Sequence, residues 1–210
     1  MEKISLYDLL SVLLPGALLT LAIEVIAIDL GFDIEALEVN NYFKLTIFLS
    51  SSIFIGSLIN IFTRKLLWLY KKFGLYTPIK KIYKSSTDLE LIKPFFKEKM
   101  NSLEFDSSKK ENIEQLWSVV YYELEATEKI NSPKAFQSFY FFFRNFFSLG
   151  AILLIPLILL TICHWYSAKY LFLLIIDVLG IIFSISAAKW NRIKMVERMF
   201  WTYYSLHKNK

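Results

Sequence analysis

The stretch FFSLGAILLIPLILLTIC, residues 146–163, decides the fold class because it carries no charged side chain over its whole length. A helix crosses a hydrocarbon layer of about 30 Å with about 20 apolar residues. Three other stretches are similarly apolar: residues 9–28, 45–62 and 170–188. The segments 45–62 and 146–163 are slightly short for a full crossing, and the other two have the full length. The sequence therefore predicts four transmembrane helices.

The composition indicates a membrane protein with a polar part. Hydrophobic residues make up 55% of the chain and the mean hydropathy is +0.43, whereas 20% of the residues are charged and lie mostly between and after the apolar segments. We expect an all-α integral membrane protein with two transmembrane hairpins and a small helical cytoplasmic domain between them. The expected divisions are a first hairpin at 1–63, a cytoplasmic helical region at 64–145, a second hairpin at 146–188 and a basic amphipathic C-terminal helix at 189–210.

The charge distribution predicts the orientation. Residues 64–147 hold 15 Lys and Arg against 10 Asp and Glu, and residues 189–210 hold 6 against 1, whereas the link 29–44 holds four acids and one lysine. Positively charged loops stay on the cytoplasmic side of the inner membrane. We therefore expect both termini and the middle region inside the cell and the two short links outside. The first segment is interpreted as a retained span, because Glu24 lies late in it and no Ala-x-Ala cleavage site follows.

Capping signals predict helices in the middle region. The Thr87–Glu90 box starts a helix over about 88–103, and the Ser108–Glu111 box starts one over 108–130. Ser132 followed by Pro133 starts another helix, which is expected to run straight into the third span. The helix over 108–130 and the tail both show one apolar stripe at helical spacing. These stripes are Ile113, Leu116, Trp117, Val120 and Leu124, and then Ile193, Val196, Phe200 and Tyr203. The tail helix is expected to lie against lipid headgroups or the middle helices, or to bind a partner.

Basic side chains follow the second span and the fourth span. We expect them to form a basic cytoplasmic surface near anionic lipid headgroups, which explains the pI of about 9.1 without nucleic acid. These residues are Arg64, Lys65, Lys71, Lys72, Lys80, Lys81, Arg192, Lys194 and Arg198.

Two acids interrupt the apolar spans. A charge near the middle of a bilayer costs about 2.5 to 3.5 kcal/mol even on the lenient insertion scale, so Glu24 and Asp177 should face protein or water. Counted from the outer ends of their spans, both acids reach similar depth, and Thr161 and His164 close the third span on the same side. A polar site of these four residues would bind a proton, cation or ligand. Alternatively, Glu24 reaches the outer interface while Asp177 is protonated or hydrogen-bonded to a neighbouring helix.

Small and polar residues recur at four-residue spacing in two spans. Such residues let helix backbones approach closely and form hydrogen bonds across the contact. They are Ser52, Gly56 and Asn60 in the second span, and Gly180, Ser184 and Ala188 in the fourth. We expect these faces to pack helices within one chain or between subunits, and a pore lining is the alternative.

Signatures of catalysis or of cofactor binding are absent from the sequence. It contains no Walker A loop, no GxGxxG, no GxSxG and no HExxH, and two histidines with one cysteine cannot build a metal cluster. We therefore expect no catalytic residue, no metal and no cofactor, and we interpret the chain as non-enzymatic. A membrane-embedded enzyme remains a minor alternative.

Short motifs in the spans resemble a widespread group of small bacterial four-span proteins. They are Tyr7–Leu10 with Leu13–Gly16, Phe54–Ile59, Phe139–Asn145 and the aromatic tail Arg192–Tyr204. Some members of this group resemble membrane components of phage-defence operons, such as the four-span subunit of Kiwa systems or the membrane accessories of RNA-targeting CRISPR loci. The resemblance brings no established catalytic residues with it.

The resemblance and the predicted topology together suggest two functions. The first is a homo-oligomeric membrane subunit of a bacterial antiviral or stress-response system, which senses membrane perturbation or opens as a pore and docks a soluble partner on its cytoplasmic helices. The alternative is a small ion or solute transporter or channel that uses Glu24 and Asp177. The lipid bilayer is the only partner that the composition itself requires.

Overall fold

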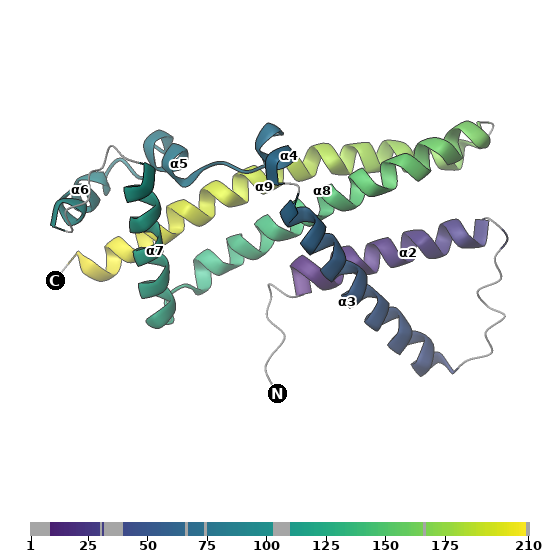
Figure 1. The fold of residues 1–210 in the computed structure, drawn as a ribbon, viewed down its shortest axis with the longest axis horizontal. Helices are drawn as coiled ribbons and strands as arrows, with labels where there is room; N and C mark the ends of the chain where they lie inside the picture. Colours follow the sequence, from purple (N-terminus) through teal and green to yellow (C-terminus); the bar gives the residue numbers. More distant parts are fainter. Residues whose placement is uncertain are drawn as a thin grey trace. The chain divides into compact units, whose positions relative to one another are not determined.

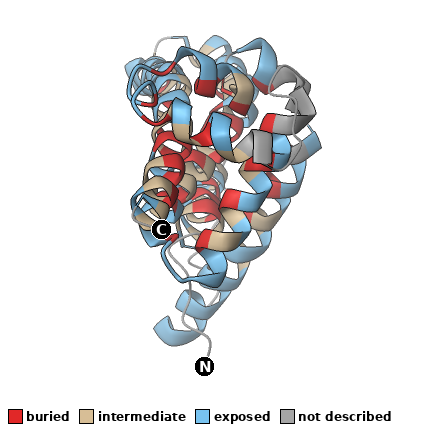
Figure 2. Ribbon diagram, turned by 90° about the vertical axis from the view of Figure 1, so that its left-hand side faces the viewer, coloured by how far each residue is buried: buried red, intermediate tan, exposed pale blue. Residues whose placement is uncertain are grey.

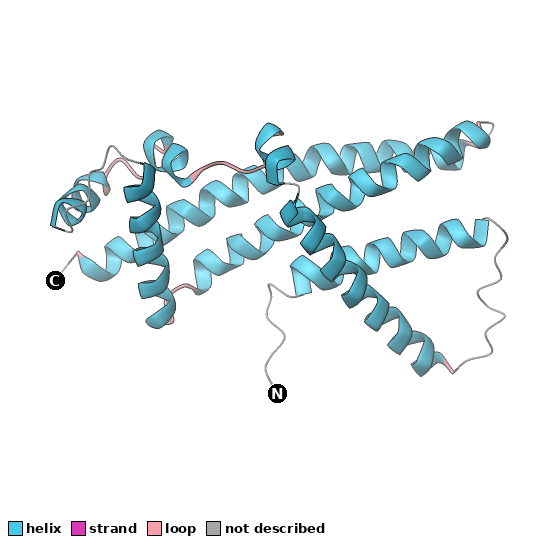
Figure 3. Cartoon of the chain, viewed as in Figure 1, coloured by secondary structure: helices cyan, strands magenta, loops and turns pink. Residues whose placement is uncertain are grey.

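The computed structural model describes residues 9–29, 31, 40–65, 67–73, 75–102, 110–165 and 167–208. This part of the chain is built from helices and turns and contains no strand (Figure 3), so the all-α prediction is confirmed. Four of its helices are long and apolar enough to cross a membrane. They contain the four predicted segments, and each extends beyond its segment at one end or both.

The chain divides into two compact units. Residues 1–75 and 138–188 form the first, which we call the span unit, and residues 76–137 and 189–210 form the second, which we call the core unit. Two long helices, α8 (Asn131–Cys163) and α9 (Ala168–His207), contribute residues to both units.

The span unit begins with a short π-helix, η1 (Leu9–Leu13), that leads directly into α2 (Leu14–Asp29). Helix α3 (Asn41–Lys65) packs along η1 and α2, and the short α4 (Leu67–Lys72) follows it (Figure 1). The apolar parts of α8 and α9 complete the unit. Many large apolar side chains of these helices are exposed. Figure 2 colours the ribbon by how far each residue is buried.

The core unit has a contiguous hydrophobic interior. It is formed by α5 (Ile79–Ser85), α6 (Lys93–Ser102), α7 (Lys110–Ala126), the first residues of α8 and almost the last half of α9. Both predicted stripes lie in this interior. The residues fully or almost fully buried are Ile113, Leu116, Val120, Leu124, Val196, Phe200 and Tyr203, while Trp117 and Ile193 are partly buried against them.

Several predicted helix limits need correction. Residues 88–92 form turns, and α6 starts only at Lys93, because Pro94 has the fixed φ that suits a first helical turn and so places the start there. Helix α7 ends at Ala126 rather than 130, where the chain turns through Glu128 at a φ of 57°. Ser108 of the second capping box lies outside the described residues. The helix predicted to start at Ser132 and to enter the third span is α8, and the tail is a continuation of α9.

Candidate functional site

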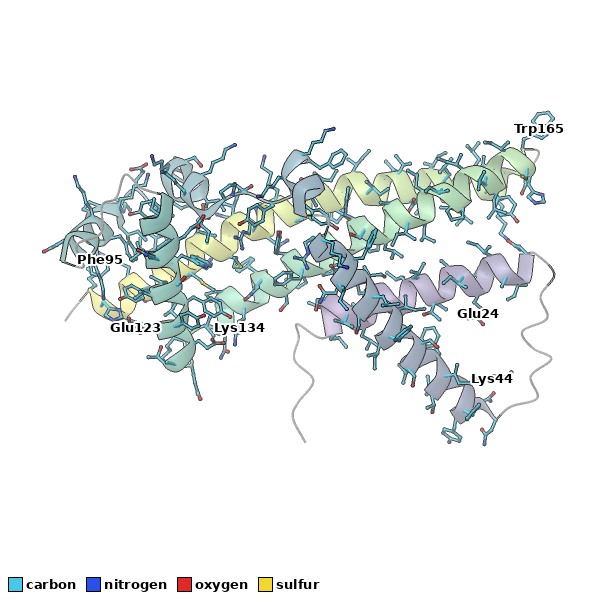
Figure 4. The ribbon with its side chains drawn as sticks, in the orientation of Figure 1. Glu24, Lys44, Phe95, Glu123, Lys134 and Trp165 are labelled. Atoms are coloured by element: carbon cyan, nitrogen blue, oxygen red, sulfur yellow. The ribbon has the colours of Figure 1, made fainter. Side chains whose placement is uncertain are left out.

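The described contacts place the four polar residues expected to cluster in different surroundings. Asp177 lines a cavity bordered by α2, α8 and α9, and Glu24 is not among the described residues that line it. The Glu24 side chain extends from the side of α2 that faces away from α8 and α9 in Figure 4. Thr161 donates its hydroxyl to the Leu157 carbonyl of its own helix at 2.7 Å. The His164 ring lies against the Tyr170 ring, with their centres 5.3 Å apart.

An ion pair joins the end of α2 to the start of α9. The Lys169 ammonium donates to both carboxylate oxygens of Asp29, at 2.8 and 2.6 Å. The Tyr170 hydroxyl donates to Asp29 Oδ2 at 3.2 Å. The polar group that meets the His164–Tyr170 pair is therefore Asp29, five residues beyond Glu24.

Two glycines allow α3 to cross η1 and α2 with the backbones in contact. A Cβ built on Gly16 would collide with the carbonyl group of Ser52, and one built on Gly56 would collide with the carbonyl of Val12. Ser52 is fully buried at this crossing, and its hydroxyl donates back to the Phe48 carbonyl at 2.7 Å. This is close small-residue packing within one chain.

Asn145 of α8 donates to a backbone carbonyl that lies four residues before a proline. Pro15 has no N–H, so it cannot donate to the carbonyl four residues earlier, that of Ser11. The Asn145 amide nitrogen donates to this carbonyl at 2.5 Å, and both residues are fully buried. In hydrocarbon an unsatisfied backbone group costs several kcal/mol. Asn145 therefore holds α8 against the junction of η1 and α2.

A second set of buried polar contacts surrounds Arg144. Its guanidinium donates to the Asn60 side-chain carbonyl at 3.0 Å and lies 4.5 Å from the centre of the Phe141 ring. One helical turn further, the Ser148 hydroxyl is hydrogen-bonded to the Tyr70 hydroxyl and accepts from the Thr63 hydroxyl at 3.0 Å. Together with the Asn145 contact, these bonds tie α8 to η1, α3 and α4. We call the whole set the polar node; its members are Ser11, Asn60, Thr63, Tyr70, Arg144, Asn145 and Ser148.

Asp177 lies in a different environment, on an apolar cavity of about 410 Å³. The cavity is lined by fourteen residues of α2, α8 and α9, and among them only Asp177 has a polar side chain. Its Oδ2 atom is buried and has no hydrogen-bond partner within the described part of the chain. Its Oδ1 atom lies only 3.1 Å from the point that a Cβ on Gly150 would occupy, so the missing side chain of Gly150 makes room for the carboxyl group.

The second predicted small-residue face, Gly180, Ser184 and Ala188 of α9, includes a close contact with α8. Ser184 and Ala188 are fully buried, and the Ser184 hydroxyl donates to the Gly180 carbonyl at 2.7 Å. A Cβ on Gly180 would lie 3.2 Å from the Phe146 ring of α8, which is a tight contact. Both predicted faces thus contain residues that are buried inside one chain.

The core unit carries its own charged cluster. Glu197 is buried and accepts a hydrogen bond from the Ser86 hydroxyl at 2.6 Å. Lys194 donates to Glu197 at 2.7 Å and to Asp88 at 2.9 Å. The hydrogen bond from Lys194 and its positive charge hold the pKa of the Asp88 carboxyl below its usual value. The indole of Trp201 donates to the Asp88 carbonyl at 2.9 Å, so the turn before α6 is fixed to α9.

The predicted basic residues occur in both units. Lys65, Lys71 and Lys72 are exposed in the span unit, and the Arg64 side chain lies outside the described part of the structure. In the core unit Lys81 and Arg198 are exposed and Lys80 is partly exposed. The other two residues are engaged: the Arg192 guanidinium lies 5.4 Å from the centre of the Tyr76 ring, and Lys194 belongs to the cluster around Asp88.

The described residues contain no group of three or more His, Cys, Asp or Glu side chains that could hold a metal ion. Comparisons with protein-family models, with curated proteins and with solved structures gave no match.

Proposed function

We propose that the protein is a multi-pass protein of a bacterial inner membrane, and that it serves as a non-enzymatic subunit of an antiviral or stress-response system. In this proposal α2 with α3 and α8 with α9 form two transmembrane hairpins, and the core unit and both termini lie in the cytoplasm. The protein senses a disturbance of the membrane, or opens as a pore, and passes the signal to a soluble partner on the core unit.

The continuity of α9 carries this proposal. Ala168–His207 is one helix of 40 residues, about 60 Å long, whereas a membrane crossing uses only about 20 residues. The remaining part ends in the interior of the core unit, where Val196, Met199 and Phe200 are fully buried. In this proposal a rotation or tilt of the span passes along α9 to the residues around which the core unit is packed. Helix α8 also contributes to both units.

The single cysteine provides a direct test of the orientation. Cys163 is exposed at the end of α8, so a membrane-impermeant maleimide should label it in intact cells. A matched variant with Cys163→Ser and Lys129→Cys moves the thiol to an exposed position in the core unit. This variant should react only after the cells are permeabilised. Labelling of the Lys129→Cys thiol in intact cells would refute the orientation.

The transmission step is tested by interrupting α9 between the units. We would insert Gly-Ser-Gly-Ser between Lys189 and Trp190 and place the same insertion between Ser167 and Ala168 as the control. The first insertion should abolish protection of cells against phage while the protein still accumulates in the membrane, and the control should retain protection. Full protection by the first variant would show that the function does not pass through α9.

A small cation transporter or channel is the second candidate, and the position of Asp177 on an apolar cavity favours it. Ion flux into proteoliposomes should then be lost with Asp177→Asn and retained with Glu24→Gln, because only Asp177 lines the cavity. Equal flux by both variants and the unchanged protein would reject this candidate.

A further inference from the structure

The cavity beside Asp177 combines apolar walls with one unsatisfied carboxyl group. Its walls come from three helices, with Leu18 of α2, Leu153 of α8 and Leu173 of α9 among them. Gly150 and Gly180 leave space where side chains would otherwise fill the gap between α8 and α9. The buried Oδ2 atom of Asp177 has no partner among the described residues, and a buried polar group without a hydrogen bond is unfavourable.

We infer that this cavity binds a hydrophobic organic cation, with the charged nitrogen at Asp177 and the apolar body against the leucine-rich walls. A lipid acyl chain would fill the walls and leave the carboxyl group unsatisfied. An inorganic cation such as Ca²⁺ needs six to eight oxygen ligands, whereas the lining offers one carboxyl group. A primary ammonium group supplies both the hydrogen-bond donors and the charge that Asp177 lacks.

Binding of such a cation should release a proton. In an apolar cavity an isolated carboxyl group stays neutral by holding a proton. When an ammonium ion arrives, the carboxyl group gives this proton to water and the resulting carboxylate pairs with the ammonium. The lining residues of α2, α8 and α9 include no other titratable or charged side chain among those described, so the exchange depends on Asp177 alone.

Binding of an organic cation beside Asp177 requires only that the span unit lies in a membrane or a membrane mimetic. It does not depend on a role in antiviral defence, and a failure to bind the cation would not affect the proposed transmission of a signal through α9.

The test compares two probes of the same skeleton, 1-naphthylmethylamine and 1-naphthylmethanol, which differ in charge. Binding to the full-length protein in nanodiscs is measured by equilibrium dialysis, and empty nanodiscs provide the correction for partition into lipid. The amine should bind at least about tenfold more tightly than the alcohol. Asp177→Asn should remove this difference. Glu24→Gln, which also removes one acid from a span, should retain it because Glu24 is not part of the described lining.

A measurement on the unchanged protein keeps the inference testable if Asp177→Asn does not fold. Raising the pH removes the competing proton, so amine binding should strengthen as the pH rises while the amine stays charged, and alcohol binding should not change. Ala22→Phe, which places a ring in the cavity from α2, should weaken the binding of both probes. Equal affinity for the two probes, or amine binding that ignores both the pH and Asp177→Asn, would overturn the proposal and leave an apolar groove for lipid.

Discussion

The span unit and the core unit are organised in opposite ways. In the core unit one interior of large apolar side chains is buried, and the charged residues lie mostly outside. In the span unit the buried residues include Ser11, Ser52, Thr63, Arg144 and Asn145, while most of the large leucine, isoleucine and phenylalanine side chains are exposed. The described apolar cluster of that unit contains only Leu19, Ile59 and Leu149 as buried members.

This difference reflects the two solvents for which the units are suited. Water drives apolar side chains together, and the gain is about 25 cal/mol for each Å² buried, so the core unit is stabilised by its interior. Lipid tails are as apolar as leucine and provide no such drive, so helices in a membrane associate through close backbone packing and hydrogen bonds. Gly16, Gly56 and the polar node supply these contacts. Each unit should therefore lose stability when its own kind of contact is removed.

The largest effect is expected for Gly56→Leu. The new side chain would begin where the Val12 carbonyl lies, and two helix backbones cannot separate without breaking the contacts on both sides of them. We expect a loss of more than about 4 kcal/mol, seen as failure to recover folded protein in mild detergent.

Ser186→Leu is the control for Gly56→Leu, because Ser186 is an exposed small residue in α9 and its replacement adds the same kind of side chain. It should be recovered like the unchanged protein. Normal recovery of Gly56→Leu would mean that α3 does not cross η1 at Gly56.

The second prediction compares the same substitution in the two units. Leu116→Ala removes a fully buried side chain from the core unit and should cost about 2 to 5 kcal/mol. Leu58→Ala changes a side chain that is 50% exposed on α3 and should cost less than about 0.5 kcal/mol. Both are measured by thermal unfolding of the full-length protein in detergent. Equal losses would show that the units are not stabilised differently.

Local patterns in the sequence are enough to predict the four apolar helices and the stripes of α7 and α9. A run of apolar residues or a helical repeat is complete within one segment, so no distant partner is needed to recognise it. Depth along two helices does not give their rotation, so the sequence could not predict which side chains of α2 lie beside Asp177. The cavity is lined by neighbours of Glu24 and not by Glu24 itself.

Sequence patterns do not predict the polar node, because its partners lie far apart in the chain. Asn145 meets the carbonyl of a residue 134 positions earlier, and Ser148 meets Tyr70 across 78 positions. One signal was present, because a proline within an apolar segment leaves the carbonyl four residues earlier without its donor. Such a carbonyl can accept from a side chain of another helix, and Asn145, directly before the third apolar stretch, carries a suitable amide.

The third prediction uses this relation between Pro15 and Asn145. Asn145→Ala removes the donor to the Ser11 carbonyl and should cost about 1 to 3 kcal/mol. Pro15→Ala supplies a backbone N–H that can donate to the same carbonyl. Asn145→Ala should therefore cost less in the Pro15→Ala background, by at least about 0.5 kcal/mol in a double-mutant cycle of thermal unfolding. If the losses of the two single variants simply add in the double variant, the contribution of Asn145 does not depend on Pro15.

The smallest effect is expected at the charged cluster of the core unit, where a surface ion pair adds little to a hydrophobic interior. The pKa of Asp88 is lowered in the folded protein by its hydrogen bond with Lys194, so the pair stabilises the folded state above the usual carboxyl pKa of about 4. That contribution is lost as the pH falls through about 4 toward the lowered pKa. Asp88→Asn should thus unfold at a slightly lower temperature than the unchanged protein at pH 7, and this difference should shrink as the pH falls from about 4 toward the lowered pKa of Asp88. Glu98→Gln removes an exposed acid of α6 and controls for the loss of one negative charge. The two unfolding temperatures could instead differ by the same amount from pH 7 to pH 3. The effect of Asp88 would then come from the turn before α6, and its ion pair with Lys194 would not contribute to the stability of the core unit.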